Sequence, residues 1–307
     1  MSAERLPGVS YADWSETADT LHAHTQLLGK LAVALAAPEP QLQHAALRLT
    51  ARGWETAPLP APDGSGAFVA LLDLRAHEAA VEHSGGGTRR IPLTPDRPVG
   101  DVTRDVLAAV GELAGGVKID PTPQEVSWSA PLDSDTEHAT YDTDAVARYF
   151  MAASAAALIL AEFRAPYRGR VTPVNAWWGS FDLAVNFFSG RSADPPAADF
   201  IMRNAMDSQE VALGWWPGDQ RYPRAAFYSY AHPAAEGYAD ASVQPPPARW
   251  AAELGEYILD WDDARAASDP REAVLAFARS TFEHACAVCD WDPALAASAS
   301  GTPPPLR

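Results

Sequence analysis

The chain has 307 residues, of which 47% are hydrophobic, so it is long enough to bury one large core or two of ordinary size. Lys and Arg number 23 against 40 Asp and Glu, which gives a net charge of −17. Such a surface repels phosphate backbones and anionic membrane faces, so the composition argues against nucleic acid or a membrane as partner. The expected partner is a small-molecule substrate or ligand.

The sequence contains neither a secretory leader nor an apolar run long enough to span a membrane. The N-terminus MSAERLPGVSYADW has no basic stretch that leads into an apolar run. The longest apolar run, residues 151–163, is shorter than the roughly 18 residues of a span and ends in charge. We therefore expect a cytoplasmic protein.

Cys286 and Cys289 are the only cysteines and form a C-x-x-C spacing near the end of a predicted helix. This spacing can serve redox or metal chemistry, but neither a second pair nor a strand-to-helix redox context accompanies it. The spacing therefore predicts two reduced helix residues.

In the first half of the chain, hydrophobic periodicity predicts a helix, several strands and a second helix. Residues 13–36 have helical spacing, and a helix at 99–114 is closed by Gly115 and Gly116. Between these helices, strands are predicted in HAALRLTARGW, GAFVALLDLRA, EAAVEH and RRIPL, with a hairpin turn at SGGGT.

The second half repeats this order of elements. A helix at 143–165 is capped by Asp142 or Thr143. The remaining predictions are strands at 171–188, in QEVALGWW, in AAFYSYAHP and at 255–261, a helix at 270–288, and a disordered tail at 291–307.

The repeated order predicts an α+β fold, a mostly antiparallel sheet with packed helices, built from a duplicated α-β-β-β-α unit. The two halves are expected at residues 1–130 and 131–290 and share one core. No nucleotide-binding glycine motif occurs, so the sequence implies no nucleotide cofactor.

Polar side chains alternate with apolar ones along two predicted strands. The second strand has Trp178, Asp182 and Asn186 on its polar face, and the first has His44 and Arg52. A half-solvated antiparallel sheet explains this pattern. The alternative, which the large aromatic residues favour, is that the two polar faces line a cleft between the halves.

Further polar groups are candidates for the same cleft. His22, Gln26 and Lys30 are four residues apart and so form one stripe of a helix, although a solvated stripe explains them as well. The strand SYAHP has Tyr228, Tyr230 and His232 on one face, and Glu210 precedes the tryptophans of QEVALGWW.

These patterns predict general acid–base chemistry in an aromatic-walled cleft. His44, Asp182 or Glu210 is expected to act as the acid or base, and Arg52 or Lys30 to anchor an anionic group. Tryptophans would stack on a planar or cationic part of the substrate. The residues expected to bind the substrate are His22, Gln26, Lys30, Arg52, Asn175, Trp178, Tyr228 and Tyr230.

The chain resembles an uncharacterised bacterial family, the one catalogued as domain of unknown function 5996. The likeness is carried by YADWSETADTLHAHTQLLGK, LTARGWETAPLP, EHATYD, FRAPYRGRVTPVNAWWGSFDLA, FSGR, WWPG and AFYSYAHP, in family order. The family brings no established activity. The resemblance implies histidines where this chain has Asn175 and Gln209, whereas His22, Gln26, Lys30, His44, Arg52, Asp182 and Arg191 are kept.

Three functions follow as hypotheses. The first is a cytoplasmic small-molecule enzyme, with a role in specialised metabolism suggested by its departure from the family. The second is a non-catalytic binding or interaction protein, because Asn175 and Gln209 cannot replace imidazoles at neutral pH. The third is a metalloenzyme that uses His22 and His44, which the loss of the family histidines does not favour.

Overall fold

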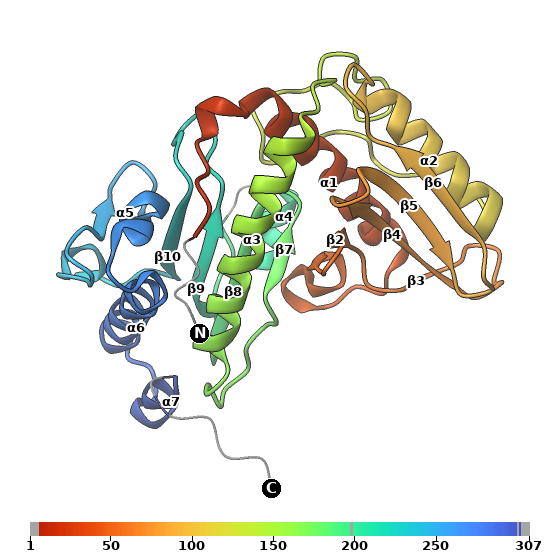
Figure 1. Cartoon of the computed structure of the whole chain (residues 1–307). Coiled ribbons are helices and arrows are strands. Elements are labelled where there is room, and N and C mark those ends of the chain that lie inside the picture. Colours follow the sequence, from red (N-terminus) through yellow and green to blue (C-terminus); the bar gives the residue numbers. More distant parts are fainter. Residues whose placement is uncertain (1–5, 197–198, 300, 302–307) are drawn as a thin grey trace, which may run out of the picture. The chain divides into compact units, whose positions relative to one another are not determined.

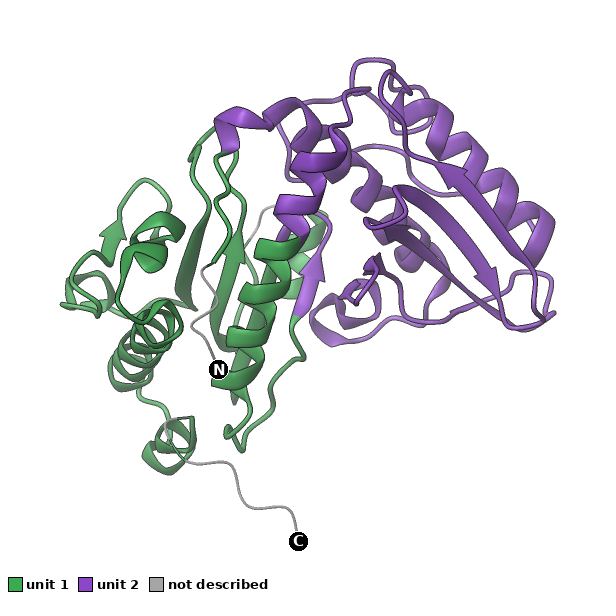
Figure 2. Ribbon diagram, viewed as in Figure 1, with its two compact units in different colours: residues 1–10, 151–174, 183–307 green, residues 11–150, 175–182 purple. Residues whose placement is uncertain are grey.

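The computed structural model describes residues 6–196, 199–299 and 301. They fold into helices and two antiparallel sheets, which confirms the predicted α+β class. The chain divides into two compact units (Figure 2). Unit 1 comprises residues 1–10, 151–174 and 183–307, and unit 2 comprises residues 11–150 and 175–182. The segments 131–150 and 175–182, expected in the second half, are thus grouped with unit 2, although β7 (Asn175–Trp177) neighbours β8 in the second sheet.

Unit 2 is built on helix α1 and an antiparallel sheet, with α2 packed against β5 and β6 (Figure 1). Its elements are η1 (Tyr11–Asp13), α1 (Ser15–Leu35), η2 (Pro40–Ala45), β1 (Arg48–Leu49), β2 (Gly53–Glu55), β3 (Leu59–Pro60), β4 (Ala67–Asp73), β5 (Glu78–His83), β6 (Thr88–Pro92), α2 (Val99–Ala114), the start of α3 (Thr143–Arg164) and β7 (Asn175–Trp177).

Unit 1 has a second antiparallel sheet, and α6 packs against β9, β10 and β12. Its elements are the rest of α3, β8 (Asp182–Ser192), α4 (Phe200–Ala205), β9 (Ser208–Trp216), β10 (Ala226–His232), η3 (Tyr238–Asp240), β11 (Arg249–Ala251), β12 (Glu256–Asp260), α5 (Trp261–Ala266), α6 (Pro270–Val288) and α7 (Pro293–Ser298). Residues 293–298, expected in a disordered tail, are therefore helical, and residues 300 and 302–307 lie outside the described residues.

Both units contain an antiparallel meander between two helices. In unit 2 the order is β2-β4-β5-β6, and in unit 1 it is β8-β9-β10-β12. Helices α1 and α2 flank the first meander in sequence, and α3 and α6 flank the second. A helix–strands–helix order recurs in both units, but each meander has four strands where three were predicted, and α4 lies between β8 and β9 in the chain.

Two predicted strands are interrupted, which changes the faces of their residues. The segment 171–188 contains β7 and β8 separated by a turn, in which Phe181 has φ +59°. Trp178 therefore lies in the turn, and the prediction that it shares a strand face with Asp182 was wrong. His44 lies in η2 instead of a strand, because Gln41 and Leu42 take left-handed conformations and turn the chain there.

Helix α3 begins where Asp142 accepts hydrogen bonds from the backbone N–H groups of Asp144 and Ala145, at 2.9 and 3.1 Å. Among the described helices, α3 has the length and composition of a membrane-crossing helix, with 44% of the apolar stretch buried. It is longer than the run at 151–163 because residues 143–150 belong to the same helix. A core helix has the same properties, and Phe163 of α3 packs edge-on against Phe187 of β8.

Candidate functional site

The sheet of unit 1 has one face that packs on helices. Phe187 of β8 contacts Phe282 of α6, and Trp215 of β9 and Phe227 of β10 contact Trp261 of α5. Because successive strand residues point to opposite sides, the alternate residues of these strands form the other face.

Nine residues form three cross-strand rows on this other face, which we call the Glu210 face. The rows are Ala184–Gly214–Tyr228, Asn186–Ala212–Tyr230 and Phe188–Glu210–His232, each running from β8 through β9 to β10. Residues opposite each other in antiparallel strands have Cβ atoms about 5 Å apart. Glu210 and His232 are therefore neighbours, and Glu210 is the acidic residue of the face, on its middle strand.

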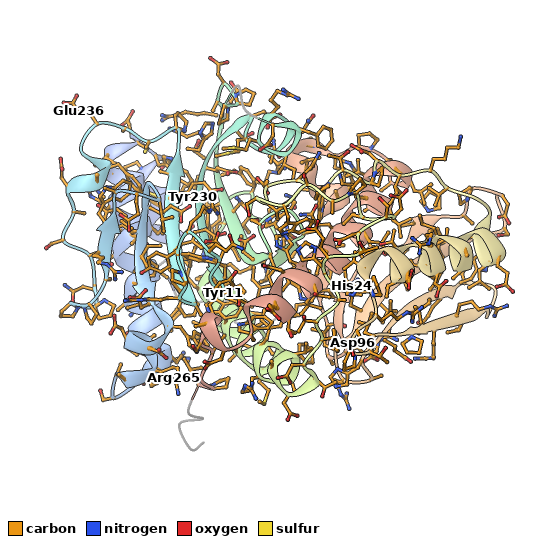
Figure 3. All side chains as sticks on the ribbon, turned by 90° about the horizontal axis from the view of Figure 1, so that it is seen from above. Tyr11, His24, Asp96, Tyr230, Glu236 and Arg265 are labelled. Carbon is orange, nitrogen blue, oxygen red and sulfur yellow. The ribbon has the colours of Figure 1, made fainter. Side chains whose placement is uncertain are left out.

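Glu210 is 2% exposed and is hydrogen-bonded on this face. The amide Nδ2 of Asn186 donates to Oε1 of Glu210 at 3.2 Å, and the side chain of Tyr230, labelled in Figure 3, also bonds to the carboxyl group. Burial raises the pKa of Glu210 to about 8, although both hydrogen bonds and the charge of Arg170 lower it. The carboxyl group is thus mostly protonated at pH 7.

Two buried polar atoms on the Glu210 face have no hydrogen-bond partner among the described residues. They are Oδ1 of Asn186, a residue that is 8% exposed, and Nε2 of His232. A buried polar atom without a hydrogen bond typically costs about 1–3 kcal/mol, and native proteins normally supply a partner, often an ordered water or a ligand. These atoms therefore mark a place where a ligand gains hydrogen bonds that the protein does not make itself.

Aromatic rings form the rest of the face. A Cβ atom on Gly214 would lie 2.2 Å from Cζ of Tyr228, so the glycine is what lets this ring lie against β9. The rings of Tyr228 and Tyr230 are parallel within 4°, with centroids 6.2 Å apart, and Trp216 meets Tyr228 edge-on at 5.5 Å. Glu210, Tyr228 and Tyr230, all predicted from sequence, thus lie together.

The other eight predicted site residues belong to unit 2. In the stripe of α1, Gln26 and Lys30 are buried and His22 is half-buried, so the solvated alternative was wrong. Oε1 and Nε2 of Gln26 bond the backbone N–H and carbonyl oxygen of Gln124 at 2.9 and 2.7 Å. Nε2 of His22 lies 3.0 and 2.9 Å from the carbonyl oxygens of Trp178 and Gly179, and so carries a proton.

Lys30, the third residue of the stripe, lies 5.6 Å from the ring centroid of Trp178, and its Nζ is 3.8 Å from Asp120. Burial lowers the pKa of Lys30, and Asp120 offsets this in part. Trp178 is 2% exposed and packs directly on the backbone of α1. In unit 2 the indole therefore belongs to the core of the unit.

Gly29 makes the close approach of Trp178 to α1 possible. A Cβ atom on Gly29 would lie 2.1 Å from Cγ of Trp178. We expect Gly29→Ala to destabilise the protein by about 1–3 kcal/mol, the usual range for overpacking, in urea unfolding. Gly111→Ala in α2, where nothing lies within 4 Å of the new Cβ, should stabilise by about 0.5–1 kcal/mol. Equal effects at both positions would contradict this account.

Phe181 explains the turn between β7 and β8. Its ring stacks on His22, Trp54 and Tyr149 with centroid distances of 5.0, 5.4 and 5.2 Å. This packing holds a left-handed backbone that is unusual for a bulky residue. The aromatic residues near NAWWGSFD thus build the interior of unit 2 around Phe181.

Asn175 joins the start of β7 to η2 and β1. Its Oδ1 accepts from Arg48, and its Nδ2 donates to Oε1 of Gln43 at 2.9 Å. His44, in the same segment, accepts at Nδ1 from the backbone N–H of Glu39 at 3.0 Å. Asn175 is fully buried and works as a structural link within the unit.

Arg52 and Asp182 also have partners within unit 2. The guanidinium of Arg52 lies between Glu82 and Glu55, at 2.9 and 3.4 Å, and these hydrogen bonds raise its pKa. This pairing contradicts the prediction of a free anion anchor. Asp182 accepts a hydrogen bond from Ser180. One cleft containing the predicted residues of both units stays a prediction.

Several positions considered for metal or redox chemistry have ordinary surroundings. The described ranges contain no group of three or more His, Cys, Asp or Glu placed to hold a metal ion. Cys286 and Cys289 are buried free thiols, and burial raises the pKa of Cys286 to about 12. Gln209, where the family resemblance implies histidine, bonds Ser189 at 2.6 Å and the carbonyl oxygen of Cys289 at 3.2 Å.

The sequence analysis placed Asn186 and His232 on polar strand faces but did not predict them as site residues. Their importance rests on the register of three strands and on the missing hydrogen-bond partners. The sequence did contain a signal for both residues: in a continuous strand, Asn186 would share a face with Asp182, and His232 shares one with Tyr228 and Tyr230, because residues two apart point to the same side.

The fold and the Glu210 face define an α+β protein with two helix-flanked meanders and a buried, hydrogen-bonded carboxyl group. The model of a family described as a family of unknown function (DUF5996) matches residues 6–298. The chain belongs to this family, which confirms the resemblance. No curated protein and no solved structure matches the chain.

Proposed function

We propose that the protein is a cytoplasmic small-molecule enzyme that performs general acid–base chemistry on the Glu210 face. The observation that carries this proposal is a buried carboxyl group, whose pKa burial raises to about 8, beside two buried polar atoms without hydrogen-bond partners among the described residues. Groups whose pKa is brought close to the operating pH by burial are characteristic of catalytic acids and bases.

In this proposal Glu210 acts first as the acid. Its carboxyl proton moves to a basic atom of the bound substrate, which leaves a carboxylate on Glu210. Asn186 and Tyr230 stabilise that carboxylate, because their hydrogen bonds lower the pKa of Glu210. His232, opposite Glu210 across the strands, orients the substrate through Nε2. Return of the proton to Glu210 completes the cycle.

A non-catalytic binding protein is the second candidate. The unpartnered Oδ1 of Asn186 and Nε2 of His232 favour it, because they need a ligand but no reaction. In that case Glu210 only recognises the ligand, and no proton moves.

A metabolite screen separates the two functions. Ligands found by NMR line broadening are incubated with the wild-type protein, and products are sought by mass spectrometry. For an enzyme, we expect Glu210→Gln to reduce kcat roughly 100- to 10,000-fold, the usual range for losing a general acid or base. Glu236→Gln, an exposed residue of unit 1 labelled in Figure 3, serves as the control with unchanged kcat.

Turnover that survives Glu210→Gln would contradict the proposed role of Glu210. Ligand binding without turnover by the wild type would favour the binding protein. A screen in which no ligand contacts the Glu210 face would overturn both.

A further inference from the structure

One acceptor of the Glu210 face, Oδ1 of Asn186, has no donor partner among the described residues. Oδ1 of Asn186 can only accept, while its Nδ2 already donates to Glu210. The bonds from Asn186 and Tyr230 favour the charged form of Glu210. A ligand that completes this arrangement therefore brings a hydrogen-bond donor to Oδ1 of Asn186.

The charge around Glu210 is balanced only in part by the protein. The charge of Arg170 favours the ionised form of Glu210, and its guanidinium lies over the ring of Phe188 at 4.4 Å, but no ion pair to Glu210 is found among the described residues. Asp207 adds a second negative charge that acts on Glu210. A cation entering this face would meet an unpaired carboxyl group in a poorly solvated place, where charge pairing is stronger than in water.

Aromatic rings next to the carboxyl group suit the same kind of ligand. Tyr230 bonds to Glu210, and its ring is parallel to that of Tyr228. The faces of tyrosine rings attract ammonium and guanidinium-like groups. The half-exposed Tyr230 and His232 place the edge of the face at the protein surface. The net charge of −17 also attracts cations to the protein.

We propose that the Glu210 face binds an organic cation, a protonated amine or an amidinium, whose N–H groups donate to Glu210 and to Oδ1 of Asn186 while its apolar part lies on Tyr228 and Tyr230. This inference rests on the site of the proposed function and names the class of its ligand. The bound state forms when the carboxyl proton of Glu210 moves to the neutral amine or amidine, which is the acid step of the proposed function, and the resulting cation pairs with the carboxylate.

Two matched pairs of probes test the inference on the full-length chain. Benzamidine is compared with neutral benzamide, and phenethylamine with neutral 2-phenylethanol, by NMR titration with indole and backbone amide signals of unit 1 as reporters. We expect each cation to bind at least tenfold more tightly than its neutral counterpart. Glu210→Gln should reduce this preference to less than twofold, and Glu236→Gln should leave it unchanged.

Equal binding of the neutral probes, or a preference that survives Glu210→Gln, would overturn the cation inference. Absence of binding by all four probes would overturn it as well. These results leave the proposed function intact if the metabolite screen finds a neutral ligand whose turnover depends on Glu210. Asn186→Asp should strengthen cation binding severalfold, because a carboxylate then replaces the amide at the second contact; unchanged binding would contradict that contact.

Discussion

Replacing Glu210 with glutamine is expected to stabilise the protein by about 4 kcal/mol more at pH 8 than at pH 5, in urea unfolding followed by circular dichroism. The pKa of Glu210 is about 8 in the folded protein against 4.5 for an ordinary glutamate. Between these values the unfolded chain gives up the proton while the folded one keeps it. The stability that this group contributes is therefore complete below pH 4.5 and is lost as the pH rises to 8.

Glutamine keeps the shape and the amide can still bond Asn186 and Tyr230, but it does not titrate. Glu236→Gln, at an exposed position, should show no such difference between pH 5 and pH 8. If the stability of both variants relative to the wild type changes equally between pH 5 and pH 8, Glu210 does not keep its proton in the folded protein. That result would contradict its proposed role as an acid.

His24, in unit 2, is expected to make the protein less stable as the pH falls, whereas Glu210 makes it less stable as the pH rises. It lies on α1, is 2% exposed, and its Nδ1 has no partner among the described residues (Figure 3). Burial lowers its pKa to about 4 from 6.5, with Asp135 opposing and Arg97 and His138 adding to the effect. His24 of the unfolded chain is thus protonated below pH 6.5, whereas His24 of the folded protein is protonated only below about pH 4.

Stability from the neutral His24 is therefore complete above pH 6.5 and is lost as the pH falls toward 4. A loss of about 1.4 kcal/mol per pH unit gives about 3 kcal/mol across this range. His24→Leu removes the titrating group, so its stability relative to the wild type should rise by about that amount from pH 7 to pH 4.5.

The half-exposed His83 of β5 provides the matched control, His83→Leu. Its stability relative to the wild type should change little over the same range. A His24→Leu variant that is as acid-sensitive as the wild type would show that His24 takes up its proton in the folded state as readily as in the unfolded chain.

Signals within single segments of the sequence were sufficient to predict the long helices and the core strands. The helix predicted at 99–114 is α2, with Gly115 at its end, because periodicity and a glycine stop act within one segment. The paired hydrophobic runs that became β4 and β5 are likewise local. The α+β class follows from these elements.

The turn that separates β7 from β8 could not be predicted, because the residues that stabilise it lie far away in the sequence. Phe181 takes its left-handed conformation in a stack with His22, Trp54 and Tyr149, which come from three other segments. The hydrophobic pattern of NAWWGSFDLAVNFF carries no sign of that turn.

For the candidate site, strand parity was enough to select Glu210, Tyr228 and Tyr230, since residues two apart share a face. The alternation of residues along a strand could not show that Arg52 is paired with Glu82, or that the side chain of Gln26 is hydrogen-bonded to the backbone of Gln124. Nor could it show that Oδ1 of Asn186 is left without a partner, which depends on the cross-strand register.

The most direct test of the account is a carbon-13 NMR titration of the Glu210 carboxyl group in the folded protein, with the resonance assigned by its loss in Glu210→Gln. The account predicts a midpoint near pH 8, well above the ordinary 4.5. A midpoint near 4.5 would mean that Glu210 is an ordinary carboxylate at neutral pH, and the proposed acid would not exist.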